Sequence, residues 1–157
     1  MEWHVTFIEI DIGSTVENIG DGALAEQIAL GKIHIPDTVK SIGNGTFYGC
    51  TKLANEDGFV IVRDWLYDYR NDGTKIRIPG NVTNIGEGAF NWCETIEEVF
   101  IPNNVKYIGE RVFDGCDKLM CVNTEKTKAE IQSMNYPIWD LYPGCVIHCQ
   151  DGDIIIE

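Results

Sequence analysis

The chain has 157 residues, of which 44% are hydrophobic and 24% charged, a composition that indicates one globular domain and excludes a disordered protein. Its 25 acidic residues outnumber the 12 basic ones and give a net charge of -13 at pH 7. This charge repels phosphate backbones and excludes direct nucleic-acid binding through a basic surface, whereas mimicry of a nucleic acid stays open.

The N-terminal stretch MEWHVTFIEI has neither the basic segment nor the apolar segment of a signal peptide. No apolar run approaches the roughly 18 residues of a spanning helix, so membrane insertion is not expected. Two locations stay open. The protein is cytoplasmic if Met1 is its natural start, and it is secreted or on the cell surface if the chain is a trimmed part of a longer protein.

A repeated pattern governs most of the chain. IPDTVKSIGNGTFYGC begins at Ile35, IPGNVTNIGEGAFNWC at Ile78 and IPNNVKYIGERVFDGC at Ile101. The last two copies are 23 residues apart, and a degenerate copy, IDIGSTVENIGDGAL, begins at Ile10. Repetition at such a period is typical of a solenoid, in which each coil covers the apolar face of its neighbour.

Each copy predicts the same local structure. The Ile-x-Ile pair before the proline, such as Ile33 and Ile35, has the alternation of a strand with one buried face, and the proline ends that strand. Apolar residues from Val39 to Leu53 then follow mostly in steps of three, which indicates tight turns and short helical pieces. A glycine lies where each copy turns back, and we expect a positive φ there. These glycines are Gly43, Gly86 and Gly109.

The step between the second and third copies is 43 residues, so an irregular, hairpin-like coil is inserted there. Its aromatic residues Trp65, Tyr67 and Tyr69 alternate along the chain and share one face of a predicted strand. Two interpretations stay open for them. They form a partner-binding surface, or they cover the sheet as β-favouring residues commonly do.

The segment from Thr124 to Met134 has Thr127 three residues before Glu130, the spacing of a capping box at the start of a short amphipathic helix. Terminal coils of a solenoid need a covering element, and this helix is expected to cap the C-terminal end. The aromatic residues expected to complete the two caps are Tyr136, Trp139 and Tyr142 at the C-terminal end and Trp3 and Phe7 at the N-terminal end.

The pattern IP..V..IG...F.GC..L resembles the BspA-like leucine-rich repeats of bacterial surface proteins, over residues 10–53 and 76–119. The resemblance implies a right-handed leucine-rich-repeat-like solenoid, with a parallel β-sheet on one side and turns or short helices on the other, mainly β with minor α. It also implies adhesion to host or partner proteins without enzymatic activity. The expected organisation is one solenoid domain, 1–157, with regular coils at 10–30, 33–53, 76–96 and 99–119, an irregular hairpin coil at 54–75 and a C-terminal cap at 120–157.

Three cysteines, Cys50, Cys93 and Cys116, occupy the same position of the repeat. Their side chains should point in parallel into the core, an orientation that is unsuited to disulfide closure. We therefore expect buried free thiols at these positions.

The C-terminal cysteines fall outside that position. Cys121, Cys145 and Cys149 can pair if the protein is secreted. Cys145, His148 and Cys149 also form a compact C-x-x-H-C group, but a closed zinc site needs a fourth ligand, and residues of a strand alternate between its faces. No metal is expected.

No constellation of catalytic residues emerges from the sequence. A cysteine nucleophile needs a base within reach, and the positions of His4, His34 and His148, at the two ends of the chain and at one outer strand position, imply no such pairing. The segment DGDIII near the C-terminus lacks the twelve-residue pattern of a calcium loop and predicts a turn followed by a last strand. We expect neither an enzyme nor a cofactor.

Residues that flank the buried Ile-x-Ile pairs should face outward and form rows on one exposed sheet. Three basic side chains gather there on an acidic protein, which favours a partner with an acidic patch; a solvated face whose charges merely prevent aggregation is the alternative. The predicted partner-binding residues of this sheet face are Glu9, Asp11, Lys32, His34, Lys75, Arg77, Glu98 and Phe100.

The predicted function is a non-catalytic protein–protein interaction or adhesion module of bacterial cell-surface type, with a protein or a glycan as ligand. One alternative stays open. The acidic charge and the absence of a signal peptide also fit an intracellular inhibitor from a mobile element, acting as a nucleic-acid mimic or an anti-defence protein.

Overall fold

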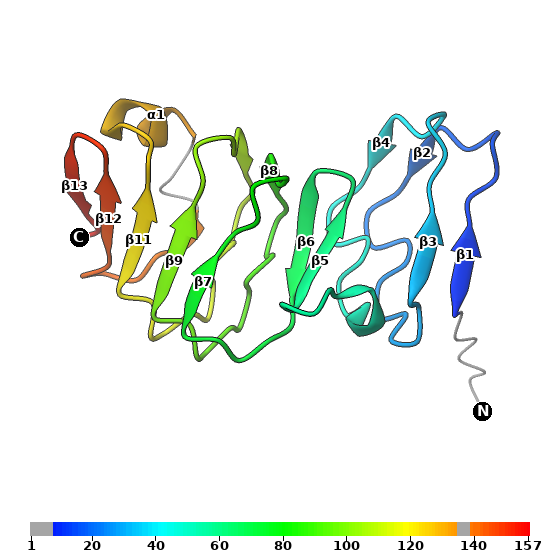
Figure 1. The fold of residues 1–157 in the computed structure, drawn as a ribbon, viewed down its shortest axis with the longest axis horizontal. Helices are drawn as coiled ribbons and strands as arrows, with labels where there is room; N and C mark the ends of the chain where they lie inside the picture. Colours follow the sequence, from blue (N-terminus) through cyan, green and yellow to red (C-terminus); the bar gives the residue numbers. More distant parts are fainter. Residues whose placement is uncertain (1–7, 135–138) are drawn as a thin grey trace.

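The computed structural model describes residues 8–134 and 139–157. The chain is an elongated β-solenoid of about six coils, mostly strand with little helix. Strand β1 (Glu9–Asp11) lies at one end of the stack and strand β13 (Gly152–Ile155) at the other (Figure 1). The solenoid fold predicted from the repeats is therefore confirmed.

A first row of short strands forms the sheet side of the stack. Besides β1, its members are β3 (Lys32–His34), β7 (Lys75–Arg77), β9 (Glu98–Ile101), β11 (Cys121–Thr124) and β12 (Val146–Cys149). β1 and β3 pair in parallel, and β7, β9, β11 and β12 form a second parallel array that ends with β13, which is antiparallel to β12. The irregular coil separates these two sheets.

A second row of two-residue strands lies where the repeat reads Ile-Gly. These strands are β2 (Asn18–Ile19), β4 (Ser41–Ile42), β8 (Asn84–Ile85) and β10 (Tyr107–Ile108). β2 pairs with β4, and β8 pairs with β10, in parallel. The coils are numbered below by their strands: β1 and β2 form the first coil, β3 and β4 the second, β7 and β8 the fourth, and β9 and β10 the fifth.

Stacking in register builds the core. In the large sheet Ile76, Val99, Val122 and Ile147 are consecutive cross-strand partners, and all four side chains are buried. β-branched residues are suited to this position because they pack well against neighbours on a pleated surface. Each coil thus closes the apolar face of the next, as the repeat predicts.

The irregular third coil is a hairpin of β5 (Phe59–Val62) and β6 (Trp65–Tyr69), antiparallel to each other, with β6 parallel to β8. The buried core consists of two clusters, and the hairpin contributes to both. Tyr67 packs against Phe47 of the second coil, with ring centroids 5.0 Å apart, and Tyr69 packs against Phe90 of the fourth, 5.4 Å apart. The hairpin therefore joins the two halves of the stack.

The tip of the hairpin is fastened to both neighbours. Arg63 donates hydrogen bonds from its guanidinium group to the carbonyls of Val39 and Pro36, each 3.0 Å long. Asp64 accepts hydrogen bonds from the side chains of Thr83 and Asn84 in the fourth coil. The side-chain contacts of Asp64 add to a backbone hydrogen bond from Thr83 N to Asp64 O, 2.9 Å long.

The turn glycines are needed for a different reason from the predicted one. Gly43, Gly86 and Gly109 do not have positive φ, so that expectation is wrong. Glycine is needed there because backbones approach closely: a Cβ on Gly109 would lie 2.6 Å from the amide nitrogen of Glu87, and one on Gly43 would meet the backbone of Asp21. A methyl group at these positions would push neighbouring coils apart.

Two short helices complete the fold: the 3₁₀ helix η1 (Thr51–Leu53) and the α-helix α1 (Lys128–Ser133). The predicted capping box of α1 is confirmed, since Glu130 N donates to Thr127 Oγ1 (3.3 Å) and Thr127 N donates to Glu130 Oε2 (2.7 Å). Neither of these helices, the only two in the described parts of the chain, has the length and apolar character to span a membrane.

The C-terminal cap is built as predicted in part. Ile131 of α1 and Trp139 are fully buried against the last coils, whereas Tyr142 is largely exposed. The predicted turn and last strand are confirmed by the antiparallel pair of β12 and β13. Three residues expected in the caps lie outside the described residues: Trp3, Phe7 and Tyr136.

Candidate binding surfaces

The predicted sheet face presents its outward residues as cross-strand pairs. All eight lie at outward positions of β1, β3, β7 and β9, and they are exposed except for Glu98 and Phe100, which are half-buried. The pairs in register are Glu9 with Lys32, Asp11 with His34, Lys75 with Glu98, and Arg77 with Phe100.

Several of these pairs are held by direct contacts. Lys75 Nζ lies 2.9 Å from Glu98 Oε2, and the Arg77 guanidinium carbon lies 3.8 Å from the centroid of the Phe100 ring. Asn123 of β11 continues the row by donating a 2.8 Å hydrogen bond to Glu98. The outward side chains are thus ordered with respect to one another before any partner arrives.

The charges in these pairs shift one another's proton affinity. A hydrogen bond and the charge of Glu98 raise the pKa of Lys75, and the same contacts lower the pKa of Glu98. The pair formed by Lys32 Nζ and Glu9 Oε1, 2.5 Å apart, raises the pKa of Lys32 in the same way. Because these groups are exposed, the pairs order side chains more than they stabilise the fold.

The expected single strip of sheet-face residues is wrong in one respect. Lys32 and His34 lie on the two-stranded sheet, whereas Lys75 and Arg77 lie on the edge strand of the five-stranded sheet. The hairpin coil interrupts the row because its strands pair with the second row instead. Two smaller charged faces result.

The hairpin aromatics do not form an exposed surface. Tyr67 and Tyr69 are each only 4% exposed, and burial raises the pKa of Tyr67 to about 12. Trp65 is half-buried and packs against Tyr67 and Tyr107, with ring centroids 6.0 and 5.5 Å away. Of the two interpretations, the structure therefore favours cover of the core, to which Phe59 and Leu66 of the same coil also contribute.

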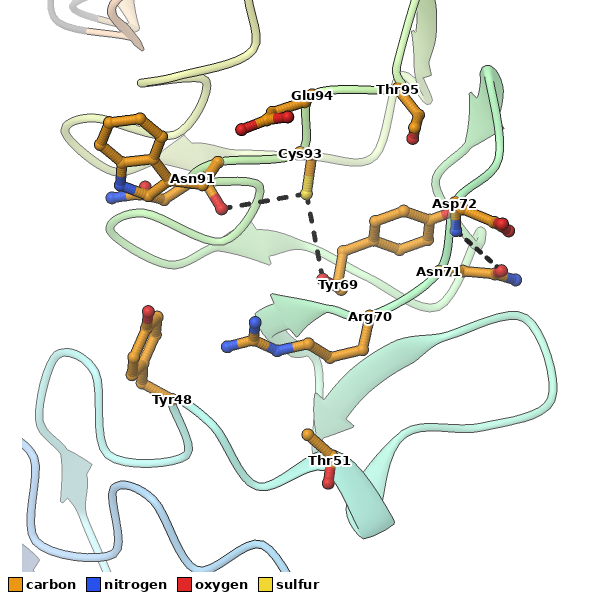
Figure 2. Close-up of a pocket in the computed structure, with 11 residues that line it drawn as sticks. Tyr48, Thr51, Tyr69, Arg70, Asn71, Asp72, Asn91, Cys93, Glu94 and Thr95 are labelled. Atoms are coloured by element: carbon orange, nitrogen blue, oxygen red, sulfur yellow. Dashed lines mark hydrogen bonds between the residues drawn. The ribbon is translucent and has the colours of Figure 1, made fainter.

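A hollow that the sequence did not predict lies on the turn side, beside the hairpin coil. From Leu66 the third coil reaches Thr74 in eight residues, whereas the fourth takes twelve from Ile85 to the equivalent Glu97. The missing turn leaves a hollow of about 690 Å³ between the second and fourth coils (Figure 2). This hollow, called the notch below, is lined by Tyr48, Thr51, Tyr69, Arg70, Asn71, Asp72, Asn91, Trp92, Cys93, Glu94 and Thr95.

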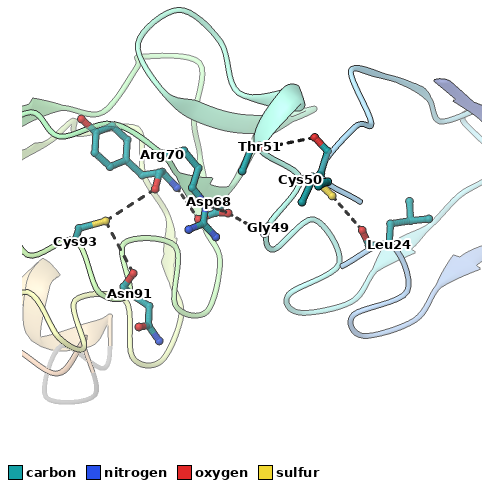
Figure 3. Close-up of polar contacts among 10 residues, drawn as sticks. Leu24, Gly49, Cys50, Thr51, Asp68, Arg70, Asn91 and Cys93 are labelled. Carbon is teal, nitrogen blue, oxygen red and sulfur yellow. Dashed lines mark hydrogen bonds and ion pairs between the residues drawn. The ribbon is translucent and has the colours of Figure 1, made fainter. Parts of the chain in front are cut away.

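A buried carboxylate, that of Asp68, replaces the missing backbone next to Arg70 of the notch. In a regular coil the amide of Trp92 donates to a backbone carbonyl of the next coil, but the equivalent amide, of Gly49, donates to Asp68 Oδ2 (3.1 Å; Figure 3). Arg70 Nε lies 2.6 Å from the same oxygen, and its guanidinium carbon lies 5.0 Å from the centroid of the Tyr48 ring.

Burial governs the electrostatics of this pair. Desolvation raises the pKa of the Asp68 carboxyl, although Arg70 and the amides of Gly49 and Tyr69 lower it. Partial burial lowers the pKa of Arg70, but the charge of Asp68 together with the hydrogen bonds to Asp68 and Tyr48 outweighs this effect, so the pKa is raised. Because the cost of burying these charged groups offsets much of their attraction, the pair fixes the positions of the two side chains more than it stabilises the fold.

Trp92 occupies an unusual backbone position at the rim of the notch. The equivalent residues of the second and fifth coils, Gly49 and Gly115, have φ of 74° and 75°, and Trp92 keeps this left-handed conformation with φ of 59°. For a residue with a side chain the conformation costs roughly 1–2 kcal/mol. The Trp92 side chain is nevertheless 67% exposed, lying beside Gly115.

The repeated cysteines are free thiols that bond to the neighbouring coil. Cys50 Sγ donates to the carbonyl of Leu24 and Cys116 Sγ to that of Phe90, each at 3.0 Å (Figure 3 shows the first). Cys93 is half-buried, and its thiol hydrogen bond with Cys116, followed by burial, raises its pKa.

These three thiols are expected to resist alkylation in the native protein and to react after unfolding, because their burial shields the sulfur atoms from the reagent. Burial also raises the pKa of Cys50. The measurement is a short pulse of N-ethylmaleimide followed by mass spectrometry of peptides, with the half-buried Cys121 as internal comparison. Labelling of Cys50 or Cys116 as fast as Cys121 would contradict their placement in the core.

The C-x-x-H-C group does not converge on one point. Cys145 is buried, whereas His148 faces outward with its Nδ1 2.9 Å from Asp153 Oδ1. Cys149, the next residue of β12, lies half-buried on the other face. Across residues 8–134 and 139–157, no group of three or more histidine, cysteine or acidic residues is arranged to hold a metal ion.

This stack of in-register coils, with parallel strands on one side and tight turns on the other, defines the class of leucine-rich-repeat solenoids. The profile of the family described as "BspA type Leucine rich repeat region (6 copies)" matches residues 62–137. Residues 62–137, just under half of the chain, are thus a BspA-type leucine-rich repeat region. A search of curated proteins found none that matches it.

Solved structures of bacterial leucine-rich repeat proteins are similar to parts of this chain. A leucine rich cell surface protein from Faecalibacterium prausnitzii is 22% identical over 82% of this chain and 35% of its own, with a TM-score of 0.43. The leucine-rich repeat protein of T. pallidum is 26% identical over 74% of this chain and 58% of its own, with a TM-score of 0.39. One from Bacteroides ovatus is 20% identical over 90% of this chain and 30% of its own, with a TM-score of 0.41. This chain thus spans less than two thirds of each.

Proposed function

We propose that the chain is a non-catalytic protein-interaction or adhesion module of bacterial cell-surface type, with a protein as its main partner. The match of residues 62–137 to the BspA-type family, whose repeats typically serve interaction and not catalysis, supports the class of function. The location at the cell surface follows from the resemblance alone and is part of the proposal.

The observation that carries the proposal is the ordered charged face on the large sheet. Lys75 and Arg77 are exposed side by side on β7, and each is held by a partner on β9, Glu98 and Phe100. Side chains that are already ordered lose less entropy when a partner binds. On a protein of net charge -13 this local basic row favours a partner that presents an acidic patch.

Reversing the charge of the sheet face is expected to abolish partner capture. In the variant Lys32→Glu, Lys75→Glu, Arg77→Glu, the new carboxylates would face Glu9 and Glu98 and repel an acidic partner. Immobilised protein is exposed to an extract of candidate host surface proteins, and the captured proteins are quantified by mass spectrometry. We expect at least a tenfold loss of the proteins that the wild type captures.

The matched control makes the same change in net charge elsewhere. Its substitutions, at exposed lysines outside the two sheet faces, are Lys52→Glu, Lys106→Glu and Lys118→Glu. This control should capture the same proteins as the wild type. Equal capture by the sheet-face variant would rule out that face, and selective capture of a nucleic-acid enzyme would favour the inhibitor alternative.

A further inference from the structure

The lining of the notch is aromatic and polar. None of its eleven lining residues is aliphatic. Instead it combines the exposed rings of Tyr48 (41%) and Trp92 (67%) with amide, carboxylate, guanidinium and hydroxyl groups. Its volume of about 690 Å³ lies within the range of about 300–1,000 Å³ that is usual for small-molecule sites. A smaller hollow of about 390 Å³ shares Tyr48 and Asn91 with it.

Trp92 keeps a left-handed conformation although its ring is not buried. The equivalent position is glycine in the second and fifth coils and Glu26, with φ of 60°, in the first, whereas here it carries the largest side chain. The ring is mostly exposed instead of buried in the core. Strained residues are concentrated at functional sites, so the exposed ring at the rim of a hollow points to a ligand.

The missing turn also leaves hydrogen-bond acceptors open. In regular coils the equivalent carbonyls, those of Asn44 and Glu110, accept bonds from Gly22 and Gly88 of the preceding coil. Among the described residues, no backbone amide donates to the carbonyl of Glu87, which lines the smaller hollow.

A backbone carbonyl without an amide donor also lies at the wall of the notch itself. The carbonyl of Asn91 accepts no backbone amide from the described residues and has only a weak contact with Cys93 Sγ at 4.0 Å. The side-chain oxygen Oδ1 of Asn91 is shielded from solvent and has no hydrogen-bond partner in the same set of residues. A ligand rich in hydroxyl donors would satisfy these oxygens.

The charges of the notch disfavour an acidic ligand. Arg70 is already paired with the buried Asp68. Asp72 and Glu94, both exposed, form no ion pair with any described residue. The local excess of negative charge, on a protein of net charge -13, would repel a carboxylate or a sulfate.

We propose that the notch is a binding site for a neutral oligosaccharide, separate from the protein-binding sheet face. A pyranose ring has a C–H face that packs on aromatic rings such as Trp92 and Tyr48, and hydroxyl groups that both donate and accept. An aliphatic side chain of a peptide would instead need an aliphatic pocket, which the lining does not offer. The site exists because the hairpin coil omits its turn.

The test is a titration of the full chain with defined hexasaccharides, followed by calorimetry. The neutral probes are hexamers of β-1,4-glucan, β-1,3-glucan, α-mannan, β-1,4-xylan and β-1,4-linked N-acetylglucosamine, and hexagalacturonate is the acidic probe. We expect at least one neutral probe to bind and Trp92→Gly to weaken that binding at least tenfold. Because glycine adopts the left-handed conformation without strain, as at Gly49 and Gly115, this variant should keep the melting temperature of the wild type or exceed it.

A second variant and two controls keep the test decisive. Tyr48→Ala should also weaken binding, whereas Tyr142→Ala, an exposed aromatic outside the notch, should not. The triple sheet-face variant should bind the sugar like the wild type, which separates this proposal from the protein-binding one. Absence of binding by every neutral probe, equal binding by Trp92→Gly, or tighter binding of hexagalacturonate would each overturn the proposal.

Discussion

Truncation of Phe90 to alanine is expected to destabilise the protein by about 3–5 kcal/mol. The side chain is fully buried in the larger core cluster, with its ring stacked between those of Tyr69 and Phe113 at centroid distances of 5.4 and 5.6 Å. Alanine would leave a cavity that two neighbouring coils cannot close, because their spacing is fixed by backbone hydrogen bonds such as Phe90 N to Val112 O.

The loss can be measured by urea denaturation followed by circular dichroism. Lys106→Ala is the control, since Lys106 is an exposed residue in the turn before β10, and it should shift the free energy of unfolding by less than about 0.5 kcal/mol. Equal midpoints for the two variants would contradict the inward position of Phe90.

Removal of the Asp68 carboxylate is expected to be the second largest loss, about 2–3 kcal/mol for Asp68→Ala. The substitution leaves the amide of Gly49 and the guanidinium group of Arg70 without the oxygen that accepts their hydrogen bonds. Arg70 is partly exposed and can turn to water, so the expected loss lies below that of a fully buried pair.

Two further variants separate this explanation from a general effect of charge. Asp72→Ala removes an exposed carboxylate from the same hollow and should change stability by less than about 0.5 kcal/mol. Asp68→Asn keeps an oxygen for Gly49 and should lose less than Asp68→Ala. If the three variants have the same melting temperature, Asp68 does not replace a backbone hydrogen bond.

The regular part of the fold could be predicted because the repeat places the same physical demand in every copy. Alternation at Ile76 and Ile78 fixes which face of a strand is buried, and the 23-residue step fixes the partner of each residue in the next coil. The capping box of α1 is likewise local, since Thr127 and Glu130 need only each other.

The notch could not be predicted because it is defined by absent residues. The sequence of the hairpin segment does not indicate that the path from Leu66 to Thr74 is too short to build a turn. This can be seen only once the pairing of Leu66 with Ile85 is known. One signal was present in the sequence, namely Trp92 in a position that reads glycine in two other copies.

The turn glycines and the sheet face show the limits of local patterns. A glycine can serve positive φ or close backbone approach, and only the position of Glu87 next to Gly109 decides between them. The outward residues of each strand were identified, but continuity of the face depends on which row the hairpin joins, which is a long-range choice.

The hairpin coil packs differently against its two neighbours, and this limits how the solenoid can lengthen by duplication of coils. Regular coils are interchangeable, because each offers its neighbours the same set of groups, and a copied coil could be inserted among them without a mismatch. The hairpin coil presents Tyr67 to the coil before it and Tyr69 to the coil after it, with Asp68 as a substitute rung on one side only. Two hairpin coils in tandem would not fit each other, so the lineage can lengthen either half of the stack but can carry a hairpin only between regular coils.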